Sequence, residues 1–244
     1  MSELHLSRLT LRRDAKAVAP LIAVLNPDQP GARISIDHRL LWTVMPSAEA
    51  DGIAADPDGT APRFLWRRDG DLSRYFVLGP KPADGSPFFD IETRPFAPDL
   101  SAGDRLAFQL RVNATVNRKV GTGPDGRALR RRCDVTMDLI RSEEEAATAP
   151  RPRARLRDAL ADVAARDWLS RQGEANGFTL TAVQVDSYTV EDVPRQRERP
   201  VRFGVLDVQG LLDITDPAAF LTRLALGFGR ARAFGCGLML IRRA

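Results

Sequence analysis

The order of strand-like and helix-like segments in the second half of the chain restricts the fold most. Leu106, Leu110 and Val112 alternate with polar residues, the period-two pattern of a strand with one buried face. Five segments follow in the order helix, strand, strand, helix and strand, namely 156–168, 178–188, 201–212, a helix begun by Asp216-Pro217, and 238–241. This order is the split ferredoxin-like pattern.

The first half gives a weaker version of the same pattern. A strand is expected over 4–11, where a phase slip between Leu6 and Leu9 suggests a bulge. Asp14 is placed to cap a helix, and a hairpin is expected to turn at Asp69-Gly70. The expected elements are helices over 15–25 and 37–45 and strands over 64–68, 74–78 and 88–93.

These patterns predict an α+β fold of two tandem ferredoxin-like domains, with order βαββαβ. We place the first domain at residues 1–96, although its second helix is not evident, a proline-containing linker at 97–103, and the second domain at 104–244. Within the second domain, 133–140 is read as a weak strand, and 142–155 as a mobile insertion rich in charge, alanine and proline.

Several classes of protein lose support from what the sequence lacks. The two cysteines, Cys133 and Cys236, stand far apart with no C-x-x-C pattern, so neither a zinc site nor a disulfide framework is indicated. The chain contains no P-loop, no nucleophile elbow and no apolar run near the ~20 residues that cross a bilayer. We expect a cytoplasmic protein that uses no cofactor and no metal and contacts no membrane.

The positive charge of the chain is carried almost wholly by arginine. The net charge is +4, and only three of the 36 basic residues are lysines. Basic residues gather near a glycine-containing stretch over 121–126 and on the strand before it, namely Arg111, Arg118, Lys119, Arg127, Arg130, Arg131 and Arg132. The neutral Asn113 lies on the same face of that strand as Arg111. Arg195, Arg197 and Arg199 repeat the pattern in a later loop.

A solvated surface loop is the ordinary interpretation of such stretches. With Arg230 and Arg232 further on, however, this half of the chain has three separate arginine loops, which favour nucleic acid. Because aromatic residues are only 7% of the chain, a structured RNA is a better target than stacked single-stranded bases.

A glycine-rich segment over 227–237 contains Gly229, Arg230, Arg232 and Gly235. A dinucleotide site needs its glycines between a strand and a helix, whereas these follow a helix and precede a strand. Two interpretations stay open: a loop whose bare backbone lets a polyanion approach, or a tight connection that needs positive φ.

The two histidines, His5 and His38, are the candidates for imidazole chemistry. His5 lies between leucines on the expected strand, which favours a structural or solvated role. His38 is expected at an exposed helix start, where it can act as general acid or base, although a lone histidine is more often surface decoration.

Three motifs together resemble one family. They are His38-Arg39-Leu40-Leu41-Trp42, the strand Leu106 to Asn113, and the glycine-rich segment Gly227-Phe228-Gly229 with Gly235-Cys236-Gly237-Leu238. In this order and spacing they resemble the CasE family, the CRISPR repeat-RNA endoribonucleases of the type I-E Cascade complex.

The resemblance implies binding of the repeat RNA hairpin and metal-independent cleavage at the 3′ base of its stem. The 2′-hydroxyl attacks the adjacent phosphate and leaves a 2′,3′-cyclic phosphate and a 5′-hydroxyl, with His38 as general acid or base. It also implies that the product stays bound within Cascade, alongside its other subunits. Arg39, Asn113 and the basic and glycine residues named above are the expected RNA contacts.

The chain departs from the family pattern at two positions. Ser35 stands where some members have a tyrosine three residues before the histidine, and Ala114 follows Asn113 where the family has proline. An RNA-binding subunit without catalysis is the alternative, and a metabolic enzyme on the same scaffold is a third class for which no cofactor motif is found.

Overall fold

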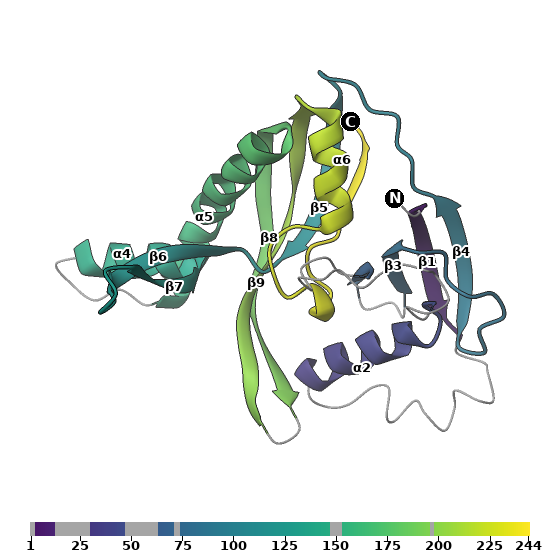
Figure 1. The fold of residues 1–244 in the computed structure, drawn as a ribbon, viewed down its shortest axis with the longest axis horizontal. Coiled ribbons are helices and arrows are strands. Elements are labelled where there is room, and N and C mark those ends of the chain that lie inside the picture. The colour runs from purple at the N-terminus through teal and green to yellow at the C-terminus, as the bar shows by residue number, and fades with distance from the viewer. Residues whose placement is uncertain (1–2, 13–29, 47–62, 71–73, 147–152, 196–197) are drawn as a thin grey trace. The chain divides into compact units, whose positions relative to one another are not determined.

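The computed structural model describes residues 3–12, 30–46, 63–70, 74–146, 153–195 and 198–244. The chain divides into two compact units (Figure 1). The first consists of Met1–Leu100, Glu191–Arg202 and Leu221–Leu238. The second consists of Ser101–Val190, Phe203–Phe220 and Met239–Ala244. Each unit is therefore assembled from segments that are far apart in the sequence.

The first unit contains an antiparallel sheet of four strands in the order β2-β3-β1-β4. The strands are β1 (His5–Leu11), β2 (Leu65–Arg68), β3 (Arg74–Gly79) and β4 (Phe89–Pro95). This is the ferredoxin-like order, and the predicted hairpin is confirmed as β2 and β3. No helix lies between β3 and β4, a stretch that is described throughout, so the second helix of the motif is missing here.

Two predictions for this unit need correction. The register of β1 with β3 and β4 runs without a shift, so the bulge predicted between Leu6 and Leu9 is wrong. The helix predicted over 37–45 is α2 (Pro30–Trp42), which begins at a proline suited to a first helical turn. It ends where the Thr43 and Val44 N–H groups bond to carbonyls three residues back, at 3.1 Å. The helix predicted over 15–25 lies outside the described residues.

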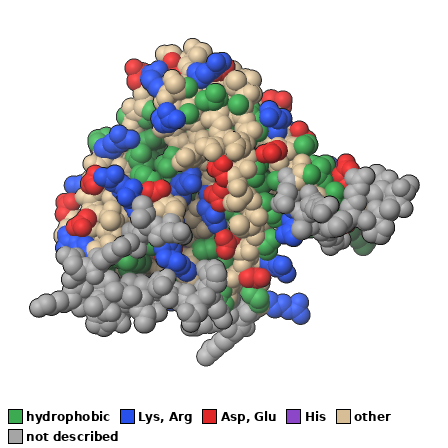
Figure 2. All heavy atoms as spheres, turned by 180° about the vertical axis from the view of Figure 1, so that it is seen from behind, with side chains coloured by type: hydrophobic (Ala, Val, Ile, Leu, Met, Phe, Trp, Pro, Cys, Tyr) green, Lys and Arg blue, Asp and Glu red, His purple; other side chains and the backbone are tan. Residues whose placement is uncertain are grey.

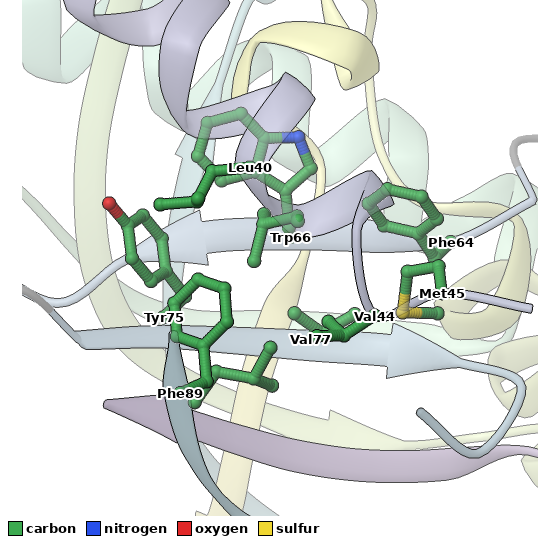
Figure 3. Packing of buried hydrophobic residues seen from close by; sticks show 10 residues of the cluster. Leu40, Val44, Met45, Phe64, Trp66, Tyr75, Val77 and Phe89 are labelled. Carbon is green, nitrogen blue, oxygen red and sulfur yellow. The ribbon is translucent and has the colours of Figure 1, made fainter. Parts of the chain in front are cut away.

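The core of the first unit combines four aromatic residues with aliphatic ones, as Figure 3 shows. Trp66, Tyr75 and Phe89 come from three strands of the sheet, β2, β3 and β4, and are each at most 2% exposed. Tyr75 packs against both other rings, at centroid distances of 6.2 and 5.9 Å. Leu40 and Leu41 of α2 are also buried in this cluster. The helix is therefore anchored to the sheet through large rings, which fixes the position of its side chains.

The second unit is organised around an antiparallel sheet in the order β10-β5-β9-β8. The elements of this half are β5 (Arg105–Val112), α5 (Arg153–Asn176), β8 (Phe178–Arg195), β9 (Glu198–Ile214), α6 (Pro217–Leu226) and β10 (Met239–Arg243). The predicted α+β class and ferredoxin-like order are confirmed. The alternation predicted in β5 holds, since Leu106, Leu110 and Val112 are each at most 1% exposed.

An inserted segment between β5 and α5 differs from the sequence prediction. It forms a hairpin of β6 (Thr115–Thr122) and β7 (Ala128–Asp134), so the basic stretch predicted as a loop is largely strand. The strand predicted over 133–140 is wrong, because α4 (Val135–Ala146) begins there. Asp134 caps it, with its Oδ1 accepting the Met137 N–H at 3.0 Å, and Thr136 and Ile140 are buried at helical spacing.

The mobile insertion predicted over 142–155 is also corrected in part. Residues 142–146 belong to α4 and 153–155 to α5, whereas 147–152 lie outside the described residues. The two ends of the expected loop are therefore helical, and α4 packs against α5. Figure 1 shows the β6–β7 hairpin, drawn in teal, extending beside α4.

Substitution of two glycines of the second unit distinguishes the cost of backbone strain from the cost of a steric clash. Gly177 and Gly126 have φ of +75° and +76°, but an alanine Cβ would meet the Asp216 carbonyl oxygen at 2.3 Å at Gly177 and nothing within 4 Å at Gly126. We expect Gly126→Ala to cost about 1–2 kcal/mol for the left-handed conformation. Gly177→Ala is expected to cost about 2–5 kcal/mol, since the clash adds to this strain. Thermal unfolding of both variants measures the difference, and equal losses would contradict the packing at Gly177.

Candidate functional site

His38 lies well inside α2, not at an exposed helix start, and its imidazole is half-buried. Trp42, one helical turn further on, donates its indole N–H to His38 Nε2 at 3.1 Å. The Phe64 ring lies at 5.8 Å from the imidazole centroid. The Trp66 ring lies at 6.2 Å and is nearly parallel, at 7°. The imidazole therefore sits among three aromatic rings, which we call the aromatic cluster.

Burial in this cluster lowers the pKa of His38 below the ordinary value of 6.5. Removing water from around the ring disfavours the charged imidazolium. His38 is therefore neutral near pH 7 and has a lone pair that can accept a proton. This is the state that a general base needs.

The residue before His38 anchors this part of α2. Asp37 is 5% exposed, and its carboxylate accepts the Tyr75 hydroxyl at 2.6 Å and a guanidinium N–H of Arg68 at 3.3 Å. Burial raises the pKa of Asp37, and the hydroxyl of Tyr75 and the charge of Arg68 oppose that rise. The pKa of Tyr75 is raised by burial and by the neighbouring carboxylate. These contacts tie the His38 turn to β2 and β3.

The glycine-rich segment lies against the same aromatic cluster, within the first unit. Gly235 has φ +76° and is buried, and an added Cβ would lie 3.2 Å from carbon atoms of the Trp66 ring. The short helix Arg232–Phe234 contacts both α2 and β2. The Phe228 N–H bonds to the Gly237 carbonyl at 2.9 Å and closes the loop. Trp66 is thus shared by His38 and the glycine-rich segment.

Both interpretations of this segment have observations behind them. The positive φ of Gly229, +64°, and of Gly235 supports the tight connection, and Ala231 also has a positive φ, +55°. Arg230 and Arg232 of the segment lie near Arg223 of α6, and burial together with the charges of Arg223 and Arg230 lowers the pKa of Arg232. Since like charges repel one another, an anion at this place would relieve their repulsion.

The β6–β7 hairpin places cations opposite cations. Arg118 pairs with Arg131 and Lys119 with Arg130 in the antiparallel register, an arrangement that is unfavourable between strands. Asp138 of α4 compensates Arg118, at 2.7 Å, and Arg127 has Asp125 at 3.6 Å. Figure 2, by contrast, shows one face of the molecule on which basic and acidic side chains are interspersed. The hairpin is therefore a built concentration of positive charge.

The other predicted RNA contacts are placed in different surroundings. Arg39 is exposed on α2, and its Nε donates to the Ser35 carbonyl at 3.3 Å. Arg111 is paired with Asp207 at 2.5 Å. Asn113 is 6% exposed and donates its amide N–H to the Gly204 carbonyl at 2.7 Å. Arg132 lies in the hairpin opposite Asn117. RNA contacts at these positions stay predictions.

Sequence reasoning missed the aromatic residues around His38. Trp42 is the last residue of the His38 motif, and its spacing of four residues from His38 is the signal that the two side chains meet on a helix. Phe64 and Trp66 reach His38 only through the folding of β2 against α2, which no local pattern gives.

Neither a metal site nor a membrane span is found in the described residues. Within these ranges no group of three His, Cys, Asp or Glu side chains is placed to hold a metal ion. None of the helices described is long and apolar enough to cross a membrane.

Comparison with solved structures finds the same fold in proteins of CRISPR systems. One is CRISPR endoribonuclease Cse3 bound to 19 nt RNA, with TM-score 0.63, 21% identity, and coverage of 98% of this chain and 99% of that one. Another is Cas6e from Escherichia coli K-12, with TM-score 0.56, 16% identity, and coverage of 98% and 100%. At these identities the likeness establishes the fold.

Sequence comparison gives the family. The CRISPR-associated endoribonuclease Cse3 of Thermus thermophilus is 28% identical over 159 residues, or 61% of this chain. The match spans 60% of the length of that curated relative. The resemblance inferred from the three motifs is confirmed by these matches. A family model described as "CRISPR associated protein" matches residues 4–243, so the chain belongs to the CRISPR-associated protein family.

Proposed function

We propose that the protein is an endoribonuclease that binds the CRISPR repeat hairpin and cleaves precursor CRISPR RNA at the 3′ base of its stem. The observation that carries this proposal is His38, held neutral in an aromatic cluster that also supports the arginine-bearing glycine-rich segment. A neutral imidazole beside guanidinium groups is the combination that RNA transesterification needs, a proton acceptor next to a phosphate binder.

The chemistry follows from the geometry of the imidazole. His38 accepts the proton of the 2′-hydroxyl, whose oxygen then attacks the adjacent phosphorus. The bond to the 5′-oxygen breaks, giving a 2′,3′-cyclic phosphate, and the imidazolium of His38 returns its proton, directly or through water, to that oxygen to form the 5′-hydroxyl. Because Ser35 replaces a tyrosine of some relatives, no phenol assists here. The reaction needs no metal ion, since the imidazole moves the protons.

The assignment of RNA contacts is part of the same proposal. The β6–β7 hairpin of the protein binds the phosphates of the RNA stem, because a polyanion reduces the repulsion between its opposed cations. Arg39, Arg230 and Arg232, all in the first unit with His38, bind near the cleaved phosphate. The proposed first domain, 1–96, carries His38 and Arg39, and the proposed second domain, 104–244, carries the β6–β7 hairpin and the glycine-rich segment. The protein acts in the cytoplasm and keeps its product within Cascade, as the likeness to a structure described as a CRISPR RNA-guided surveillance complex supports, at TM-score 0.57.

An RNA-binding subunit without catalysis is the second candidate. Two observations favour it: Ser35 has no phenol, and His38 Nε2 already accepts the indole N–H of Trp42. Cleavage of RNA by the pure protein separates the two candidates.

We expect the protein to cleave repeat hairpin RNA in excess EDTA and to leave a cyclic phosphate. His38→Ala should lower the rate by at least about 100-fold, the scale of general acid–base catalysis, with hairpin affinity nearly unchanged. Single-turnover cleavage and a binding titration measure the two quantities.

The control is His5→Ala on β1, which should leave the cleavage rate unchanged. A His38→Ala protein that still cleaves within about tenfold of wild type would remove this residue from the mechanism. Binding without cleavage by the wild type would instead support the second candidate.

We also expect the cations of the protein's β6–β7 hairpin to set the salt dependence of RNA binding. Arg130→Ala/Arg131→Ala should flatten the slope of log K against log salt by about 1 for each phosphate that the variant no longer neutralises. Arg166→Ala/Arg171→Ala removes the same charge from exposed positions of α5 and is the matched control. Equal slopes for the two double variants would assign the hairpin arginines to solvated surface.

A further inference from the structure

Two tryptophans contact the imidazole of His38, and they do so in different ways. Trp66 lies nearly parallel to the ring, and its buried Nε1 makes no hydrogen bond within the described part of the chain. Trp42 meets the imidazole edge-on, at 6.0 Å and 66°, and its Nε1 donates to His38 Nε2. Of these two side chains, Trp42 is therefore the one that acts on a nitrogen atom of the ring.

This hydrogen bond determines where the neutral ring carries its proton. A neutral imidazole has one N–H and one lone pair on its two nitrogens. Because Nε2 accepts from the indole, Nε2 holds the lone pair and Nδ1 holds the proton. An imidazolium carries hydrogen on both nitrogens, so its Nε2–H would face the indole N–H as a second donor.

We propose that Trp42 is a positioning residue that selects the Nδ1–H tautomer of His38 and fixes the orientation of the imidazole for proton transfer. Its meaning for catalysis rests on the proposed function, whereas the tautomer is a property of the free protein. In the free protein the indole N–H donates to the lone pair of Nε2, and in the complex with RNA the 2′-hydroxyl of the substrate donates to it instead.

Trp42 is itself held in position by its neighbours. The residue is 38% exposed, so burial alone leaves its side chain room to turn. The Phe64 ring packs against it edge-on at 5.0 Å, and the Arg63 guanidinium lies 5.3 Å from its ring centroid. Arg63 also donates to the Pro46 carbonyl at 3.0 Å, which fixes the cation over the indole. These contacts orient the indole N–H toward His38.

The charged groups around His38 do not determine the pKa of its imidazole. On α2, Asp37 is engaged by Tyr75 and Arg68, and Arg39 bonds to a backbone carbonyl. From the elements packed against α2 come Arg63 and, in the short helix, Arg232. Burial is the cause of the lowered pKa of His38, and none of these charges contributes to it.

The tautomer can be measured directly. The nitrogen-15 shifts of the imidazole rings distinguish a protonated nitrogen from one with a lone pair, and His38→Ala identifies the His38 signals. We expect a protonated Nδ1 and an unprotonated Nε2 in the wild type above its pKa. Trp42→Phe keeps an aromatic ring but loses the N–H, so the signals should move toward the Nε2–H tautomer. Trp66→Phe removes the other indole and should leave the tautomer unchanged.

Kinetics supply the second readout. Trp42→Phe should lower kcat about five- to tenfold, the scale of one hydrogen bond, and change KM for the RNA by less than about twofold. An Nε2–H tautomer in the wild type, or an unchanged Nδ1–H tautomer in Trp42→Phe, would overturn the proposal. If the wild type shows the Nδ1–H tautomer, lost in Trp42→Phe, but cleaves no RNA, the control of the tautomer by Trp42 stands and the proposed function fails.

Discussion

The burial of Trp66 is the constraint on which the site depends. Its ring is 2% exposed and contacts the Tyr75 ring of the sheet core, the imidazole of His38 and the backbone of Gly235. A glycine is needed at 235 because a Cβ there would press on the indole. One side chain thus joins the core, the helix with the candidate base, and a segment that lies almost 170 residues further along the chain.

The distribution of charge follows a different logic from the core. Ion pairs compensate arginines such as Arg111 and Arg118, whereas Lys119 and Arg130 face each other across two strands. Opposed cations destabilise an isolated hairpin, and a partner with negative charge, as in the proposed function, would offset this cost. The same holds for the arginines of the glycine-rich segment, where burial and mutual repulsion lower the pKa of Arg232.

Much of the fold could be predicted from the sequence, because its strongest signals are local. The alternation in β5 and the capping Asp216 before α6 depend on neighbouring residues, and both held. The strand predicted over 133–140 was wrong. Val135, Met137 and Leu139 alternate as in a strand, but the cap at Asp134 and the packing of α4 against α5 favour a helix. His38 was found from its motif, but its surroundings come from β2, which only tertiary packing brings to α2.

A neutral His38 within the aromatic cluster is the central claim, and the titration of its imidazole tests it most directly. Nuclear magnetic resonance of the free protein against pH, with His38→Ala to identify the signal, gives the midpoint. We expect a midpoint below 6.5, because burial disfavours the charged ring, and a cleavage rate that falls on the acid side with the same midpoint. A midpoint at or above 6.5, or a rate that does not follow the titration, would contradict it.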